Sequence, residues 1–166
     1  MQLVPPSTQR NISIMETRAE RHEGLAWVRG AGVSREWNGI KYKLGMSSKN
    51  VGSRQLSMNV AVVPPGAVAF AHVHVDFEVM LYILEGRVRH EYGPDLRYTI
   101  DHAAGDFIFI EPGVPHEVVN LSDTEPIIAV VARSSADEWD QIVEYPSKRR
   151  DAATTPNSQI PTPKEP

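Results

Sequence analysis

The segment GAVAFAHVHVDFEVMLYILEG, residues 66–86, sets two closely spaced histidines in an apolar run that glycines bound at each end. His72 and His74 are two positions apart, and on a β-strand that spacing places both imidazoles on the same face. Two imidazoles on one face can bind a single divalent metal ion, at about 2.0–2.1 Å each for zinc. The segment therefore predicts a strand that carries part of a metal site.

Two further ligand-type residues complete this predicted site. Glu78 has the same parity as the two histidines and follows a predicted turn or bulge, where its carboxylate can swing in beside them. His116 ends a distant segment, GDFIFIEPGVPH at residues 105–116, which predicts a strand, a Pro-Gly turn and the start of another strand. We therefore predict one divalent metal ion held by His72, His74, Glu78 and His116 across a barrel interior.

Outward from these segments the chain alternates between short apolar runs and turn residues. The predicted strands are Ile40–Met46, Gln55–Val63, Ala69–Val75, Glu78–Leu84, Arg87–Tyr92, Leu96–His102, Asp106–Ile110, His116–Asn120 and Ile127–Arg133. Strands of this length, separated by turn signals about every 8–12 residues, are typical of an all-β sandwich or barrel. We expect the barrel to span residues 39–134.

The segments on either side of the barrel have different patterns. Residues 1–38 form a weakly patterned leader, in which Leu25 to Trp37 is expected to add an edge strand. Residues 135–145 predict a short C-terminal helix on the outside of the barrel, because Ser135 to Glu138 forms a capping box. Residues 146–166 carry five prolines and little apolar surface, so we expect a disordered tail.

Composition excludes several classes of protein. The 166 residues suit one domain, and a formal net charge of -4 with mixed acids and bases argues against a nucleic-acid surface or a polybasic membrane anchor. There is no cysteine, so any metal must be held by nitrogen and oxygen. The N-terminus does not resemble a signal peptide and the longest apolar run, Val79 to Leu84, is too short to cross a bilayer. A cytoplasmic location is the default expectation.

The spacing of these residues resembles the two motifs of the cupin superfamily. The first is usually written G-x5-H-x-H-x3,4-E-x6-G, and it is matched by Gly66, His72, His74, Glu78 and Gly86. The second is G-x5-P-x-G-x2-H-x3-N, and it is matched by Gly105, Gly113, His116 and Asn120. The resemblance is to small single-domain (type 2) metal-binding cupins. It implies a double-stranded β-helix, a jelly-roll barrel of two antiparallel sheets with a pocket between them, and a homodimer.

The sequence departs from these motifs at two positions. Seven residues, rather than six, separate Glu78 from Gly86, so Val79 occupies the position where many cupins carry the glutamate. Two arrangements stay open: Glu78 turns inward as the fourth ligand, or Val79 faces the metal and leaves three histidines. In the second motif Glu111 stands where proline is usual, although Pro112 and Gly113 still predict the turn.

Other residues near the predicted ligands are candidates for the pocket. His90 shares a strand face with Val88 and Tyr92 and lines the cavity if that face points inward. Phe70, Met80 and Tyr82 have the parity of the ligands and are candidates for the pocket wall, although plain core packing is the preferred interpretation. We take Glu78, Tyr82 and His90 as the candidate catalytic residues. No phosphate loop, nucleophile elbow or dinucleotide fingerprint is present.

A site of three histidines and one carboxylate leaves coordination positions open and suits Fe, Mn, Ni or Zn, among which the ligand types cannot choose. With iron, oxygen and a chelating substrate can bind together, so a dioxygenase acting on a small molecule is the leading hypothesis. With zinc or manganese, Lewis-acid chemistry predicts an isomerase, lyase or cyclase. The third hypothesis is a non-catalytic, metal-dependent small-molecule binding protein. No nucleic-acid or membrane partner is expected.

Overall fold

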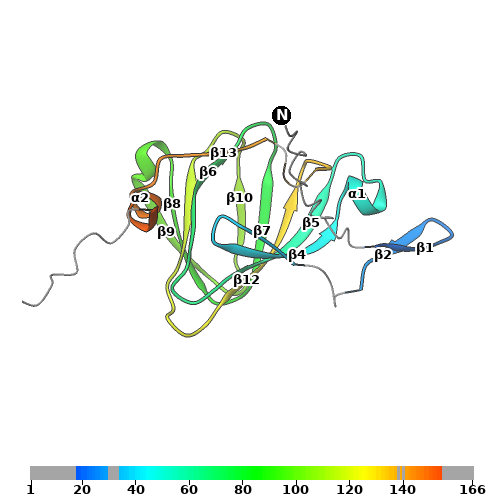
Figure 1. Cartoon of the computed structure of the whole chain (residues 1–166), viewed down its shortest axis with the longest axis horizontal. Coiled ribbons are helices and arrows are strands. Elements are labelled where there is room, and N and C mark those ends of the chain that lie inside the picture. The colour runs from blue at the N-terminus through cyan, green and yellow to red at the C-terminus, as the bar shows by residue number, and fades with distance from the viewer. Residues whose placement is uncertain (1–17, 30–33, 138, 140, 155–166) are drawn as a thin grey trace, which may run out of the picture.

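The computed structural model describes residues 18–29, 34–137, 139 and 141–154 (Figure 1). Within those residues the chain forms thirteen strands, two short helices and one 3-10 turn. The strands are β1 Glu20–His22, β2 Leu25–Trp27, β3 Ser34–Trp37, β4 Ile40–Met46, β5 Ser57–Val63, β6 Val68–His74, β7 Val79–Glu85, β8 Arg87–Tyr92, β9 Tyr98–Ala103, β10 Phe107–Ile110, β11 His116–Asn120, β12 Ile127–Arg133 and β13 Ile142–Glu144. The helices are α1 Ser48–Val51 and α2 Lys148–Thr154, and the 3-10 turn η1 is Pro94–Leu96.

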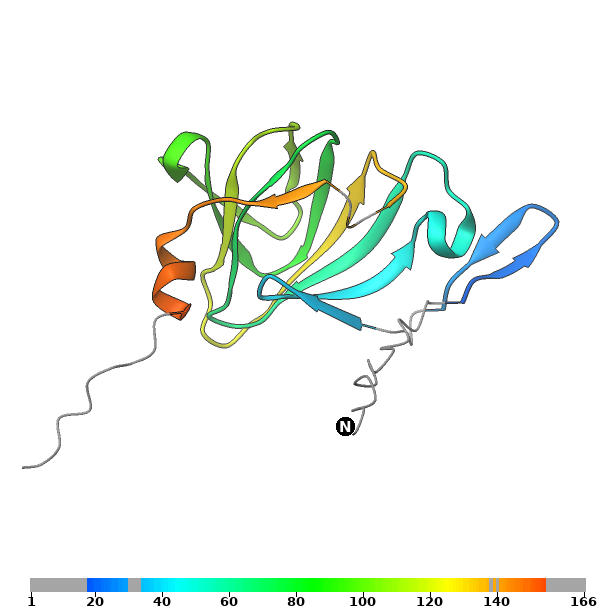
Figure 2. The ribbon, with the colours of Figure 1, turned by 45° about the horizontal axis from the view of Figure 1, so that its top comes forward.

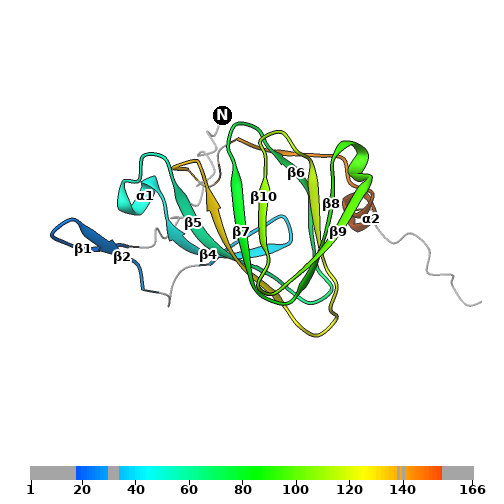
Figure 3. The same cartoon turned by 180° about the vertical axis from the view of Figure 1, so that it is seen from behind.

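Two antiparallel sheets enclose a common interior, which confirms the predicted jelly-roll barrel (Figure 2). One sheet has the strand order β10-β7-β12-β5-β4-β3, and its β10–β7 edge is seen from behind in Figure 3. The other sheet has the order β13-β6-β11-β8-β9. The neighbours β6 and β11 are distant in sequence, so segments around residues 72 and 116 meet on adjacent strands. The β1–β2 hairpin forms a separate two-stranded sheet.

The core lies between the two sheets and follows the alternation of the strands. On β12, Ile127, Ala129 and Val131 are buried in the interior, while Ile128 and Val130 are half-buried on the other face. Arg133 continues the inward series at the end of β12 and is buried as well. Alternation of this kind is what a two-sided sheet imposes on a strand. The inward face of β12 therefore passes from the apolar core to a polar end of the barrel at Arg133.

A β-bulge in β6 determines how the histidines are presented. Val118 of β11 pairs with Ala69, and His116 pairs with His72, so three steps along β6 match two steps along β11. The extra residue lets both Ala69 and His72 face the interior, which strict alternation forbids. Because the alternation breaks here, Phe70 does not share the face of His72, and its predicted place in the pocket wall is wrong. Its ring instead faces the guanidinium of Arg150 on α2, 5.7 Å away.

The described residues of the range 135–145 form no helix, and the short C-terminal helix is α2 instead. Residues 142–144 form β13, which pairs with β6 and covers its edge. Locally, Ser135 donates its hydroxyl to the carbonyl of Asp137, and the Asp137 carboxylate accepts the N–H of Trp139. These bonds make a turn from the same polar side chains that suggested a cap. Pairing with an open sheet edge then overrides the local helix signal.

Of the predictions for the segments on either side of the barrel, one agrees with the structure and one does not. The expected edge strand is present as β3, which pairs with β4. Helix α2 contradicts the expected disorder over residues 148–154, while residues 1–17, 30–33 and 155–166 lie outside the described part. Among the described residues, neither helix is long and apolar enough to span a membrane.

Candidate metal centre

Three histidines from two neighbouring strands meet inside the barrel. His72 and His74 lie on β6, and His116 begins β11 directly opposite His72. One ring nitrogen from each lies within 4.8 Å of the other two, and all three side chains are buried. The ring centroids of His72 and His116 are 4.4 Å apart, and each lies 4.9 Å from that of His74. The sequence prediction that these three residues come together is confirmed.

Backbone carbonyls fix the ring orientation of two of these histidines. Nδ1 of His72 lies 2.9 Å from the carbonyl oxygen of Phe70, and Nδ1 of His116 lies 3.0 Å from that of Val114. A carbonyl only accepts, so we assign the proton to Nδ1 in both rings and leave the Nε2 lone pairs free. This is the usual arrangement of metal-ligating histidines. His74 differs, because its Nδ1 is buried without a hydrogen-bond partner in the described part of the chain.

Burial keeps the cluster neutral. It lowers the pKa of His72 to about 3 and of His74 to about 2, chiefly through desolvation and further through the neighbouring His116. The pKa of His116 is also lowered, again by burial. Neutral imidazoles carry the lone pairs that a cation needs. Three buried, uncharged imidazoles with converging nitrogens therefore fit a divalent transition metal.

The loop before His116 is tied to the strand that carries the other two histidines. Gly113 donates its N–H to the carbonyl oxygen of His74 at 2.7 Å. Its φ of 80° lies in the left-handed region, which glycine adopts without a side-chain penalty. Asn120, at the end of the same motif, donates its side-chain amide to the carbonyls of Val63 and Glu125. The glycine of the second motif therefore holds the loop beside the site, and the asparagine holds the loops at the opposite end of β11.

The structure does not bring Glu78 to the three histidines. Its side chain is exposed, and its backbone N–H donates to the hydroxyl of Ser134 at 2.9 Å. Val79, at 2% exposure, lines the inner chamber beside His72 and His74 instead. The turn after His74 interrupts the alternation of side chains along the strand. Residues before and after the turn that are an even number of positions apart therefore need not point to the same face. The expected fourth ligand therefore faces away, and the arrangement is the three-histidine alternative.

Tyr82 and Met80 also lie away from the cavity, on the outer face of β7. The Tyr82 ring packs against Phe107, with centroids 4.5 Å apart, and Met80 is 57% exposed. The predicted role of Met80 and Tyr82 in the pocket wall is wrong for the same reason as for Glu78. The prediction counted alternate positions from His74 to Met80 and Tyr82, and that count crosses a turn at which the chain passes from one sheet to the other.

His90 lines the cavity, which is the outcome expected if the face that it shares with Val88 points inward. Both of its ring nitrogens are buried without a partner among the described residues. The ring lies 5.2 Å from that of His102, in an edge-on arrangement. Burial lowers the pKa of His90 to about 3, so the imidazole is neutral at pH 7. An uncharged, unpaired imidazole can donate one hydrogen bond and accept another from a bound molecule.

The histidine cluster connects an outer pocket with a smaller inner chamber. The outer pocket has a volume of about 400 Å³ and the inner chamber about 60 Å³, and His90 and His116 line both. The apolar part of the outer wall is Ile100, Phe107, Ile108, Phe109, Ile110 and Val114. Among the described residues that line the outer pocket none is a lysine or arginine, and Glu111 supplies a carboxylate. The pocket therefore suits a molecule that is largely apolar.

Two cavity residues and one aromatic neighbour of His72 were not predicted from sequence. Arg133 lines the inner chamber with His72 and His74. The inward alternation of β12 was the signal for it, because Arg133 has the parity of Val131. His102, which ends the predicted strand Leu96–His102, is half-buried and lines the outer pocket. Trp37 of β3 places its ring edge-on to His72 with centroids 5.3 Å apart, and no local pattern announces that contact.

A histidine cluster facing the interior of a two-sheet jelly roll is the arrangement of a cupin barrel that could hold a metal. Residues 59–132 match the family model described as Cupin domain. The chain therefore contains a cupin domain over those residues. No curated protein matches the chain.

Solved structures of oxalate decarboxylases share the fold. The formate complex of the Lactobacillus farciminis enzyme is 21% identical, with a TM-score of 0.61 over 79% of this chain and 38% of that chain. A variant of the Bacillus subtilis enzyme is 22% identical, with a TM-score of 0.62 over 79% of this chain and 34% of that one. A further Bacillus subtilis structure, described with Mn(II) centres, is 22% identical, with a TM-score of 0.59 over 75% and 34%. The chain therefore spans little more than a third of their length.

Proposed function

We propose that this cupin is a small-molecule metalloenzyme of the dioxygenase type, with one divalent metal held by His72, His74 and His116. The observation that carries the proposal is the position of the histidine cluster at the base of an apolar pocket of about 400 Å³. A transition metal bound by three histidines would supply open coordination positions for oxygen-dependent or Lewis-acid chemistry. Its identity among Fe, Mn, Ni and Zn stays open.

The residues of the chain have separable roles in this proposal. The apolar wall favours an aromatic or otherwise apolar substrate and keeps water from the reacting atoms. His90 accepts a hydrogen bond from a substrate hydroxyl or donates one to a carbonyl, because neither of its ring nitrogens has a described protein partner. The substrate class that fits is a small enol, diketone or aromatic diol with adjacent oxygens. Glu111 and the absence of basic residues among those described around the pocket disfavour an anion there.

A second candidate is a Lewis-acid lyase, isomerase or cyclase that acts on a small carboxylate. The observation that favours it is Arg133, a buried guanidinium on the wall of the inner chamber beside His72 and His74. The fold neighbours, which are oxalate decarboxylases, support the same direction. A carboxylate is small enough for the inner chamber, whereas an aromatic diol is not. A non-catalytic, metal-dependent binding protein is the third candidate.

One experiment separates these candidates. The protein is purified without added metal, its metal content is measured, and oxygen uptake and carbon dioxide release are followed with a panel of diketones, catechols and oxalate. Stoichiometric metal and oxygen consumption that disappears in His90→Gln support the dioxygenase. Release of carbon dioxide from oxalate without net oxygen uptake supports the lyase. Tight binding of a panel compound with no turnover supports the binding protein, and the absence of metal at every added ion concentration contradicts all three.

The homodimer and the cytoplasmic location stay proposals. The outer face of the β7–β12–β5 region exposes large apolar side chains, among them Met58 at 52% and Met80 at 57% exposure, which both lie beside Ala132. Contiguous apolar surface of this kind marks interaction sites in soluble proteins. We propose that a second copy of the chain covers this face.

A further inference from the structure

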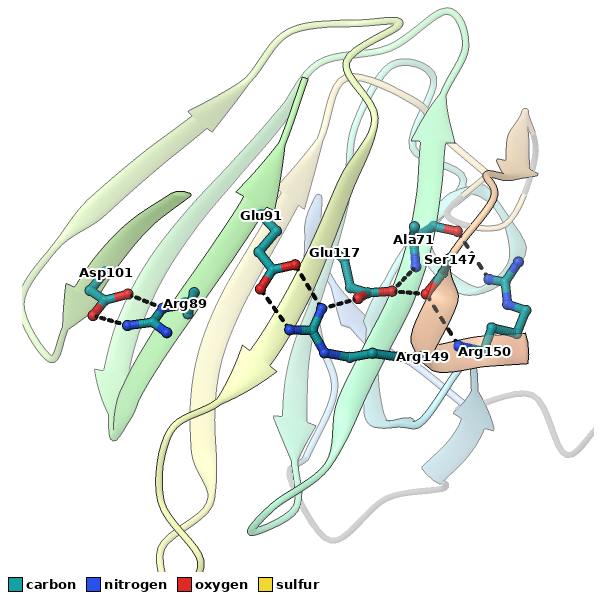
Figure 4. A network of polar contacts seen from close by, with 8 residues as sticks. All are labelled: Ala71, Arg89, Glu91, Asp101, Glu117, Ser147, Arg149 and Arg150. Carbon is teal, nitrogen blue, oxygen red and sulfur yellow. Dashed lines mark hydrogen bonds and ion pairs between the residues drawn. The ribbon is translucent and has the colours of Figure 1, made fainter. Parts of the chain in front are cut away.

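The β-bulge in β6 leaves one backbone N–H without a strand partner, and a side chain takes that partner's place. Ala71, the residue before His72, donates its N–H to the Glu117 carboxylate at 3.0 Å. Glu117 follows His116 on β11 and faces away from the barrel interior. One carboxylate therefore joins the two strands immediately beside two of the metal-site histidines (Figure 4).

Glu117 is buried at 1% exposure and depends on the C-terminal segment for its remaining partners. Ser147 donates its hydroxyl to the same carboxylate, and Arg149 of α2 donates to it at 2.6 Å. Arg149 is itself held by two hydrogen bonds to Glu91 on β8, at 2.6 and 2.7 Å. A buried carboxylate without a cation and donors is strongly unfavourable, so these contacts are required for Glu117 to stay inside.

The next residue of α2 reaches the same point of β6 from its other side. Arg150 donates to the carbonyl oxygen of Ala71 at 3.0 Å and to the side-chain oxygen of Asn38 at 3.2 Å. The amide nitrogen of Asn38 lies 3.4 Å from Nδ1 of His72 and donates to the carbonyl of Phe70, the group that orients this ring. Through Arg150, α2 therefore contacts the backbone of Ala71 and the Asn38 side chain, which lies beside Nδ1 of His72.

We propose that α2 is a clasp for the metal centre, in which Arg149 is a positioning residue that acts through Glu117. The clasp holds β6 and β11 in the register that makes His72 and His116 converge. This proposal rests on the proposed metal site. It differs from a role in stability alone because the contacts converge on the residues adjacent to the ligands and not on the core.

The molecule contains a matched control. Arg89 of β8 makes a bidentate ion pair with Asp101 of β9 in the same sheet, at 2.7 and 2.9 Å (Figure 4). That pair has the chemistry of the Arg149–Glu91 contact, but neither strand carries a proposed metal ligand. Arg89→Ala therefore removes an equivalent surface ion pair without touching the clasp.

The test is a Co(II) titration of the metal-free full-length protein, followed by the visible absorption of the bound ion. The Co(II) spectrum reports coordination geometry, which a purely structural role does not change. We expect Arg149→Ala to weaken Co(II) binding by at least 10-fold and to change the spectrum, in the range that lost outer contacts of ligands cause. Arg89→Ala should leave both unchanged. Arg149→Lys, which keeps the charge, should recover part of the affinity.

Hydrogen exchange of the Ala71 amide gives a reading that needs no metal. It should speed up in metal-free Arg149→Ala and stay slow in Arg89→Ala. If Arg149→Ala fails to fold, Glu117→Gln serves instead, because an amide has one acceptor oxygen for the donors that the carboxylate shares. Equal Co(II) affinity and spectra in wild type, Arg149→Ala and Glu117→Gln overturn the clasp while the metal site stands. A wild-type protein that binds no Co(II) overturns the proposed function and the clasp with it.

Discussion

Gly113 donates its backbone N–H to the carbonyl oxygen of His74, so the turn before His116 rests on the strand that carries the other two histidines. This bond joins the two sequence motifs at the metal site. It also means that the backbone of His74 helps to position His116. The site is consequently a property of two strands and one turn, and each part can be tested separately.

Loss of the histidines should remove metal binding without unfolding the barrel. His116→Ala and the double change His72→Ala with His74→Ala each leave too few ligands for stoichiometric binding. The glycine turns and the apolar core do not depend on these side chains. Metal analysis after purification and circular dichroism measure the two outcomes. One equivalent of metal in a purified double variant would show that the site lies elsewhere.

Glu78→Gln distinguishes the two arrangements that the sequence left open. The inward arrangement predicts a loss of metal affinity of about 10-fold, which corresponds to about 1.4 kcal/mol. Because Glu78 is exposed and Val79 lines the chamber, we expect an unchanged dissociation constant. Isothermal titration with the same metal on both proteins measures the difference. A 10-fold loss would mean that residues 75–78 rearrange when metal binds.

The buried histidines should make the metal-free protein sensitive to acid. Burial lowers the pKa of His72 and of His90 to about 3, whereas both titrate near 6.5 in the unfolded chain. The unfolded state therefore binds more protons as the pH falls from about 6.5 toward 3, and stability falls with it. Each such histidine contributes a slope of order 1 kcal/mol per pH unit in that window. Above pH 7 neither state is protonated, so the effect vanishes.

Urea unfolding of the metal-free protein between pH 7.5 and pH 5 measures this slope. The His90→Gln variant provides the comparison, because its amide does not titrate. We expect a shallower loss of stability toward pH 5 in the variant than in the wild type. Parallel curves would show that His90 is not buried as a neutral imidazole.

Two truncations separate α2 from the residues beyond it. The composition of residues 155–166 predicts that their removal changes stability by less than about 0.5 kcal/mol. Removal of residues 147–166 takes away Ser147 and Arg149 and leaves Glu117 buried without them, so we expect a loss of more than about 1 kcal/mol. Thermal melting of both proteins gives the comparison. Equal melting temperatures would contradict the described contacts of α2.

The proposed dimer predicts a change of mass in a surface variant. Met80 lies on the exposed outer face of β7, so Met80→Glu places a charge in the surface that a second copy is proposed to cover. A buried unpaired charge is strongly unfavourable, and the variant should sediment as a monomer. Leu25, exposed on the β1–β2 hairpin, is the control position for the same substitution. A wild-type protein that already sediments as a monomer contradicts the proposal.

Sequence alone predicts the parts of this protein that depend on spacing within one strand. His72 and His74 need only a period of two, and the strands from β4 to β12 need only alternation and turn residues. It fails where a residue depends on a segment distant in sequence. The face of Glu78 depends on how the turn from β6 to β7 crosses between sheets, and residues 142–144 become a strand because the edge of β6 is open. The buried role of Glu117 likewise needs α2, which no local pattern predicts.

The extra residue in β6 has a consequence for insertions and deletions. Ala69 and His72 both face the interior although they are three positions apart. A chain with one residue fewer between them restores strict alternation and still keeps both imidazoles inside. It also returns the Ala71 N–H to the ladder, so Glu117 loses one of its donors. The bulge in this sequence therefore both orients His72 and frees an N–H for Glu117, and a one-residue deletion should remove the second effect while it keeps the first.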